Sequence, residues 1–330
     1  MAGRPQCRTR RRRHAVITGL LALLLAVLAG AGPAAAATLP VSSSGATQVA
    51  FSPDGSLLAA GYADGTVRLW SVASGQAYGP VLRPGAGGGG VTGMAFSPDG
   101  SLLAAGYSGG TIGLWAVSAG QPSGAPLQAG SAVTGVAFSP DGTLLAGADA
   151  GGTIQLWNPA SGLPSGSPLQ AGSPVHAVAF SPDGKLLASA GADGAVQLWD
   201  VASGQVLGPA LRASGGIAGG AAALAFSPDG TLLAGGYGDG TIQLWHPASG
   251  QPSGSALQAG SAVNGVAFSP DGKLASADAS GAVKLWNTVP GSVGGLSLKN
   301  WIILVAIAIG IALAVLAAIV TTRDIWLARK

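Results

Sequence analysis

Side chains that could catalyse a reaction or hold a metal are scarce in this chain of 330 residues. It contains three His, one Cys and thirteen acidic residues, and every acidic residue is Asp. Cys7 and His14 lie close to the N-terminus, which leaves His176 and His246 in the rest of the chain. Such a composition excludes HExxH and CxxC motifs and paired glutamates. We therefore expect no catalytic, metal-ligating or cofactor-binding residues and no disulfide.

Ser and Asp are plentiful, so counting alone leaves a Ser-His-Asp site open. However, six Ser-Asp pairs belong to the phrase Ser-Pro-Asp-Gly, and a catalytic site is not expected to occur six times. Proline presets φ and glycine tolerates positive φ, so this phrase predicts a tight turn. The glycine run 87–90 lacks the Lys-Ser/Thr pair and helix of a phosphate-binding loop.

These turns belong to a unit that occurs six times at intervals of 42 to 46 residues, each with a Phe before the turn and a Leu-Trp pair after it. The phenylalanines are Phe51, Phe96, Phe138, Phe180, Phe226 and Phe268. The tryptophans are Trp70, Trp115, Trp157, Trp199, Trp245 and Trp286. A fixed period of about 40–45 residues is typical of propeller blades. We expect these aromatic side chains to pack between neighbouring blades.

The repeats resemble the WD40 family over residues 39–298, in a secreted bacterial form with a C-terminal membrane anchor. The resemblance implies an all-β propeller of six four-stranded blades. In the third repeat we expect strands over 133–138, 143–146 and 153–157, with a fourth around Leu169.

A leucine follows every repeat Trp by twelve residues, at positions that indicate the fourth strands: Leu82, Leu127, Leu169, Leu211, Leu257 and Leu298. The segment 38–41 could instead add a strand that closes the ring, so the closing segment is left open.

The sequence departs from the WD40 pattern at the polar positions that the family uses to stabilise each blade. The Gly-His pair is missing, and the Asp of the turn before the third strand is kept as Asp64, Asp193 and Asp239 only. The corresponding residues elsewhere are Gly109, Gly151 and Ser280. We expect the family's buried network to be largely absent and the remaining Asp residues to form turns.

The N-terminal segment 1–37 predicts a secretory signal peptide. Six Arg precede an apolar run from Ala15 to Ala31, and Ala34–Ala37 supplies small residues for cleavage. A retained anchor helix is the alternative, and the export route, general secretory or twin-arginine, stays open.

The C-terminal segment 299–322 predicts a transmembrane helix, because residues 301–320 are uncharged and mostly apolar. Arg323, Arg329 and Lys330 follow it, so the positive-inside rule places the tail 323–330 in the cytoplasm and 38–298 outside. A buried core helix is the alternative.

Charge divides the chain in the same way as hydropathy does. The net charge of +3 comes from the two ends, whereas residues 38–300 hold seven basic and twelve acidic residues, a net charge of −5. An acidic domain without a basic cluster argues against nucleic-acid binding.

Positions that differ among the repeats are the candidates for a partner-binding face. Two connections before a first strand are longer than the others, 83–90 and 212–220. The turns near them carry Tyr62, Tyr107 and Tyr237, with Asp149, Gly191 and Asp278 at the corresponding places. The fourth position before each Phe is also variable: Thr47, Thr92, Thr134, His176, Ala222 and Asn264. We expect exposed tyrosines among these residues to bind a partner; drift among duplicated repeats is the alternative.

The leading functional hypothesis is a non-enzymatic, membrane-anchored, extracytoplasmic propeller that binds a protein or peptide as a scaffold. One alternative is an exported propeller enzyme of hydrolase or lactonase type. The other is a passive structural protein of the cell envelope. The sequence does not identify the partner, the process or the oligomeric state.

Overall fold

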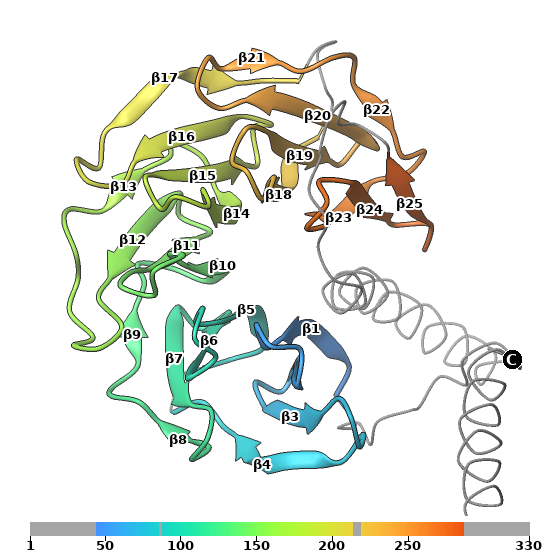
Figure 1. The fold of residues 1–330 in the computed structure, drawn as a ribbon. Coiled ribbons are helices and arrows are strands. Elements are labelled where there is room, and N and C mark those ends of the chain that lie inside the picture. The colour runs from blue at the N-terminus through green and yellow to red at the C-terminus, as the bar shows by residue number, and fades with distance from the viewer. Residues whose placement is uncertain (1–43, 86–87, 214–218, 287–330) are drawn as a thin grey trace, which may run out of the picture. The chain divides into compact units, whose positions relative to one another are not determined.

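A computed structural model describes residues 44–85, 88–213 and 219–286, and these residues form 25 β-strands arranged in six antiparallel sheets (Figure 1). The expected all-β, six-bladed propeller is confirmed. The predicted signal peptide, the closing segment 38–41, the membrane helix and the basic tail lie outside the described residues. Within the described ranges, no helix is long and apolar enough to cross a membrane.

Each sheet is one blade, and we number the blades in chain order. Blade 1 consists of β1 (Ala46–Phe51), β2 (Leu57–Tyr62), β3 (Val67–Ser71) and β4 (Ala77–Leu82). Blade 2 consists of β5 (Val91–Phe96), β6 (Leu102–Tyr107), β7 (Thr111–Ala116), β8 (Gln121–Pro122) and β9 (Leu127–Gln128). Blade 3 consists of β10 (Val133–Phe138), β11 (Leu145–Asp149), β12 (Thr153–Trp157) and β13 (Leu169–Gln170).

The second half of the chain repeats this arrangement. Blade 4 consists of β14 (Val175–Phe180), β15 (Leu186–Gly191), β16 (Val196–Asp200) and β17 (Val206–Leu211). Blade 5 consists of β18 (Ala221–Phe226), β19 (Leu233–Tyr237), β20 (Thr241–His246), β21 (Gln251–Pro252) and β22 (Leu257–Gln258). Blade 6 consists of β23 (Val263–Phe268), β24 (Leu274–Asp278) and β25 (Val283–Trp286), and its expected fourth strand lies outside the described residues.

The expected strands of the third repeat agree with β10 and β12 in full, whereas β11 begins two residues and ends three residues later than predicted. The five described leucines of the outer strands lie in β4, β9, β13, β17 and β22, as the spacing predicts. In blades 2 and 5 the outer strand is split in two, and both pieces pair with the third strand.

The first strands pack against one another from blade 1 to blade 6, so they lie innermost, and the fourth strands lie at the rim (Figure 1). Every first strand has a register irregularity after its first residue, where it pairs with the end of the second strand. Such a bulge leaves one residue out of the ladder and turns its side chain in a new direction.

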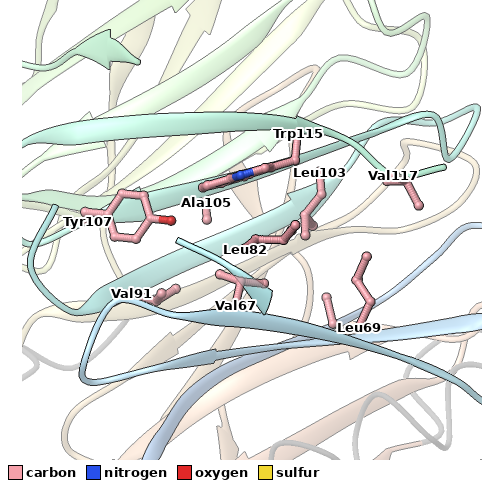
Figure 2. Close-up of a cluster of buried hydrophobic side chains, with 10 residues drawn as sticks. Val67, Leu69, Leu82, Val91, Leu103, Ala105, Tyr107, Trp115 and Val117 are labelled. Carbon is pink, nitrogen blue, oxygen red and sulfur yellow. The ribbon is translucent and has the colours of Figure 1, made fainter. Parts of the chain in front are cut away.

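The core lies between blades and is formed by the aromatic and aliphatic residues of the repeats. Figure 2 shows the junction of blades 1 and 2, where Val67, Leu69 and Leu82 meet Leu103 and Trp115. The same pattern recurs at the other described junctions, for example where Trp157 of blade 3 meets Ile112 and Leu114 of blade 2. The prediction that the repeat Trp and Phe residues pack between blades is confirmed for blades 2 to 6, whose Trp and Phe residues belong to the inter-blade clusters or pack against them.

Candidate functional site

Each blade has two differently built ends. The first turn, Ser-Pro-Asp-Gly, joins the first and second strands at one end. The second turn joins the second and third strands at the other end, where the bulge and the connection from the preceding blade also lie. Backbone bonds confirm this neighbourhood, since the amide of Gly109 in a second turn donates to the carbonyl of Gly88 in a connection at 3.0 Å. The variable residues therefore gather at the second-turn end.

The three tyrosines at this end are buried, so the expectation that they are exposed is wrong. The exposed fraction is 1% for Tyr62, 1% for Tyr107 and 0% for Tyr237. Tyr107 stacks edge-to-face on Trp115 at 6.2 Å between ring centroids, and Tyr237 does the same on Trp245 at 6.3 Å. Figure 2 shows Tyr107 inside the junction of blades 1 and 2. These side chains support the blades and cannot contact a partner as the structure stands.

Asp149 and Asp278, which replace Tyr in blades 3 and 6, are also buried, at 2% and 3% exposure. The Oδ1 atom of Asp149 accepts hydrogen bonds from the amides of Gly151 and Thr153, both at 2.9 Å. Asp278 accepts from the amides of Ser280 and Ala282 at 2.9 and 3.1 Å, and these bonds, with that of the Ser280 hydroxyl, lower its pKa. Both carboxylates thus organise the second turn of their blade.

In blades 1, 4 and 5, where the position of Asp149 is occupied by Tyr or Gly, an Asp two residues further along the chain supplies the carboxylate. Asp64 accepts from the Thr66 amide at 2.9 Å, and Asp239 accepts from the Thr241 amide at 2.9 Å. Blade 4 uses Asp193, which accepts from the Ala195 amide at 3.1 Å. The prediction that these three aspartates form turns is confirmed. Blade 2 is different because its second turn, Ser108–Gly110, contains no Asp.

The bulge residues are Thr47, Thr92, Thr134, His176, Ala222 and Asn264, and we call them the bulge ring. Thr92 and Thr134 are half-buried and donate to carbonyls of their own second strand, at 3.1 Å in both cases. Thr47, His176 and Asn264 are exposed. The variable residues of the bulge ring thus lie at one end of the blades. Three of them are exposed and three are half-buried.

Two exposed members of the bulge ring link neighbouring blades. Thr47 donates to the carbonyl of Val91, the first residue of the next first strand, at 2.7 Å. His176 Nδ1 lies 3.1 Å from the carbonyl of Ala221, which is the first residue of the first strand of blade 5. The His176 side chain is exposed despite this contact.

Arg212 begins one of the long connections and lies over the second turn of blade 4. Its guanidinium donates to a carboxylate oxygen of Asp193 and to the Asp193 carbonyl, both at 2.9 Å. Partial burial would raise the pKa of Asp193, but the Ala195 amide, Arg212 and Ser173 outweigh it and keep the pKa below its ordinary value.

The family's stabilising network is largely absent, as expected, but one of its hydrogen bonds, from the repeat Trp to a Ser, is kept in two blades. The indole nitrogen of Trp199 donates to the Ser189 hydroxyl at 2.9 Å, and Trp286 donates to Ser276 at the same distance. Elsewhere the residue opposite is Ala or Gly, which removes the acceptor. The Trp–Ser bond is thus present in blades 4 and 6 and absent from the other blades described.

Groups that would hold a metal ion are not found in the part of the chain that the structure describes: no three His, Cys, Asp or Glu side chains come together there. His176 and His246 each contact a backbone carbonyl and lie in different blades. The contacts described for exposed side chains at the second-turn end are hydrogen bonds and the ion pair between Arg212 and Asp193.

Comparison with known families agrees with this architecture. The model described as "WD domain, G-beta repeat" matches residues 36–71, 82–116, 124–158, 166–200, 217–246 and 252–287, one segment for each repeat. No curated protein sequence gives a significant match. Because the matched segments cover more than half of the chain, this protein belongs to the WD40 repeat family.

Proposed function

We propose that this protein is a membrane-anchored, extracytoplasmic scaffold that binds a protein or peptide at its second-turn end and has no enzymatic activity. WD40 propellers commonly act as protein-interaction scaffolds. The observation that carries the proposal is the contrast between the two ends of the blades. The first turns are the same in all six blades, whereas exposed side chains of different chemistry occupy equivalent places at the second-turn end.

The surface that we assign to the partner is formed by exposed residues in place of the tyrosines. Thr47, His176 and Asn264 come from three blades, and Arg212 adds a positive charge beside the connection of blade 4. Hydroxyl, imidazole, amide and guanidinium groups favour a polar, hydrogen-bonding partner surface.

Binding is tested by the double variant His176→Ala/Asn264→Ala in the full-length chain. Alanine is a safe choice because Ala222 already occupies this position in blade 5. We expect proteins captured by proximity labelling around the wild-type chain to be lost around the double variant. The matched control is Lys185→Ala/Thr143→Ala, which changes exposed residues of two first turns and should leave the labelled set unchanged. Equal loss in both variants, or in neither, contradicts the assignment.

Orientation is tested separately with a tag at the C-terminus. In intact cells, externally added protease should remove the propeller and leave the tag protected, because the basic residues after segment 299–322 favour a cytoplasmic tail. Permeabilised cells should lose both. A tag that is cleaved in intact cells contradicts the proposed orientation without bearing on partner binding.

A further inference from the structure

Blade 2 contains a cavity of about 440 Å³ on the side that faces blade 1. Thr111, Gly113 and Trp115 of β7 form one wall, and Gly124 and Gln128 of the outer segment form another. Arg83 and Tyr107 complete the lining, with Pro84 beside them. The volume lies within the range of small-ligand pockets, and the lining combines aromatic rings with a few polar groups.

The cavity exists because blade 2 lacks a side chain that other blades have. Gly113 stands two residues before Trp115, where blades 3, 4 and 5 carry Gln155, Gln197 and Gln243. Gln243 is fully buried, and its amide nitrogen lies 3.0 Å from the Leu244 carbonyl and 3.5 Å from that of Gly254. Gly254 corresponds to Gly124, so the glutamine of blade 5 fills the space that is empty in blade 2.

Packing of the tryptophan does not by itself explain this glycine. A Cβ atom at Gly113 would lie 2.3 Å from the Trp115 ring, and the residue paired with Gly113 across the strands is Ala105. Blade 1 has the same alanine at Ala60, yet it pairs with the long side chain of Arg68 while Trp70 remains buried. An alanine at this place is therefore compatible with a large cross-strand neighbour.

One residue of the lining carries a buried hydroxyl without a partner among the described residues. It belongs to Tyr107, and its burial raises the pKa, so the group remains a neutral donor. In blade 5 burial likewise raises the pKa of Tyr237, whose hydroxyl also lacks a partner among the described residues, while the Arg212 charge and the Ala213 amide act against the rise. The residue equivalent to Ala213 in blade 2 is Pro84, which has no N–H.

The positive charge beside the cavity is also unlike its counterpart. Arg212, which precedes Ala213, is paired with Asp193 at 2.9 Å. Arg83, which precedes Pro84, is exposed and forms no ion pair with a carboxylate of the described residues. Blade 2 thus presents a guanidinium and a phenol hydroxyl, both donors, around an aromatic-walled space.

We propose that this cavity binds a carboxylate joined to a small apolar or aromatic group, with Arg83 and the Tyr107 hydroxyl holding the carboxylate and the Trp115 side of the cavity holding the apolar group. Guanidinium–carboxylate pairs are among the strongest hydrogen-bonded contacts in proteins. The C-terminal residue of a peptide and a free small acid share this chemistry. The inference does not rest on partner binding at the bulge ring, since the two sites share no residue.

The test is a saturation-transfer NMR titration of the purified full-length chain with four probes. N-acetyl-phenylalanine and its primary amide differ only in the charge of the terminal group. 3-Phenylpropionate represents a free acid, and a tetrapeptide that ends in Phe represents a peptide C-terminus. We expect the carboxylate forms to bind with a dissociation constant of roughly 1 mM or below, and the amide on the order of tenfold more weakly. Comparison of the last two probes distinguishes a free acid from a peptide terminus as the source.

Variants taken from the repeat itself locate the site. Arg83→Gln introduces the residue found at Gln128, Gln170 and Gln258, and should weaken binding on the order of tenfold. Arg212→Gln makes the same change at the equivalent position before blade 5, where Gln243 fills the corresponding space. It should leave binding unchanged. Tyr107→Phe should weaken binding several-fold without lowering thermal stability, because no described partner is lost.

Filling the cavity is best tested with a paired change, because a Cβ atom at Gly113 would lie 2.3 Å from the Trp115 ring in its present position. The double variant Ala105→Gly/Gly113→Gln reproduces the Gly235–Gln243 pair of blade 5 and should abolish binding. Ala105→Gly alone is the control and should retain it. The proposal is overturned if acid and amide bind equally, if neither binds the wild-type chain, or if Arg83→Gln and Arg212→Gln have the same effect.

Discussion

The first and second turns of the blades solve the same problem, a tight connection between buried strands, in opposite ways. All six first turns use the same four residues, and in blades 1 to 5 the serine hydroxyl accepts a hydrogen bond from the amide five residues further on. The second turns use an Asp at either of two positions, and one second turn uses none. The comparison shows that one end of the repeat is fixed by the needs of its main chain, whereas the other end can vary while the fold is kept.

The physical reason for the invariance is the first-turn serine, which is buried in blades 1 to 5 and half-buried in blade 6. In blade 3 the Ser139 hydroxyl donates to Asp141 at 2.6 Å and accepts from the Leu144 amide at 2.9 Å. Asp141 in turn accepts from the Thr143 amide at 3.1 Å, and Gly142 has a φ of 72°. Each of the four residues has a separate role, so the turn admits no simple replacement. Second turns need only one carboxylate to accept hydrogen bonds from a few amides, so their other positions can vary in sequence.

Acid should cause the largest loss of stability, and it should act mainly through the first turns. Hydrogen bonds from Ser52 and Ser97 lower the pKa of Asp54 and Asp99 to about 2, and the pKa values of the other first-turn aspartates are lowered as well. Because the unfolded value is about 3.9, their contribution is complete above pH 4 and is lost as the pH falls towards 2. Thermal melts of the full-length chain at pH 7, 4, 3 and 2 should show this fall.

The matched variant is Asp54→Asn, which cannot ionise. It should melt below the wild-type chain at pH 7, and the difference should disappear near pH 2, where Asp54 is itself becoming protonated. A difference that is constant over this range would show that ionisation of the first turns does not contribute.

Among single substitutions, Asp149→Ala should have the largest effect. It removes an acceptor that is 2% exposed, leaves the Thr153 amide without its bond and leaves the Gly151 amide with only its bond to the Ser131 hydroxyl. Bonds to charged groups contribute about 1.5–3 kcal/mol each, so we expect a loss of about 3 kcal/mol in the free energy of unfolding. Denaturant titration measures this loss.

Restoring the carboxylate two residues further on should recover most of this stability. Asp149→Tyr/Gly151→Asp reproduces the Tyr237–Asp239 pair of blade 5, whereas Asp149→Tyr alone lacks the acceptor. If both variants were equally unstable, the two ways of building a second turn would not be interchangeable, and the comparison between the ends would fail.

Ser139→Ala tests the invariant end and should cost about 2 kcal/mol. Ser139 is 2% exposed, so its loss leaves the Leu144 amide without an acceptor in a buried place. Ser269→Ala in blade 6 should lower the free energy of unfolding by less. Ser269 is only half-buried, and the amide that bonds its hydroxyl is four residues further on and not five. Equal losses would show that burial does not determine the importance of the first-turn serine.

Much of the fold follows from the sequence because the repeat shows where strands and turns alternate. The strands β10 and β12 and the outer leucines were predicted at their observed places. The burial of Tyr62, Tyr107 and Tyr237 was not predicted. These residues are the last residues of second strands. A second strand lies inside its sheet and is buried on both faces, so it shows no alternation that would distinguish an inward from an outward side chain.

The cavity of blade 2 could have been found from one residue. Gly113 is the only glycine at the position two before a repeat Trp, where the other repeats have Arg, Gln or Lys. The bulges could not be predicted, because the irregular residue is Thr in three blades and His, Ala or Asn in the others, with no common turn signal. Likewise, the pairing of Arg212 with Asp193 depends on the path of the connection, which spacing does not determine.

The smallest effect is expected for Arg212→Gln, and it completes the comparison. Arg212 and Asp193 form the shortest ion pair of the described residues, at 2.9 Å, but both side chains are substantially exposed. Surface ion pairs contribute about 0–1 kcal/mol because water and salt screen them. We expect the free energy of unfolding to fall by less than about 0.5 kcal/mol, with the difference vanishing in 1 M salt. Denaturant titration at two salt concentrations measures it. A loss as large as that of Ser139→Ala would mean that the variable end also bears the stability of the blade, and its side chains would then not be free to serve a partner.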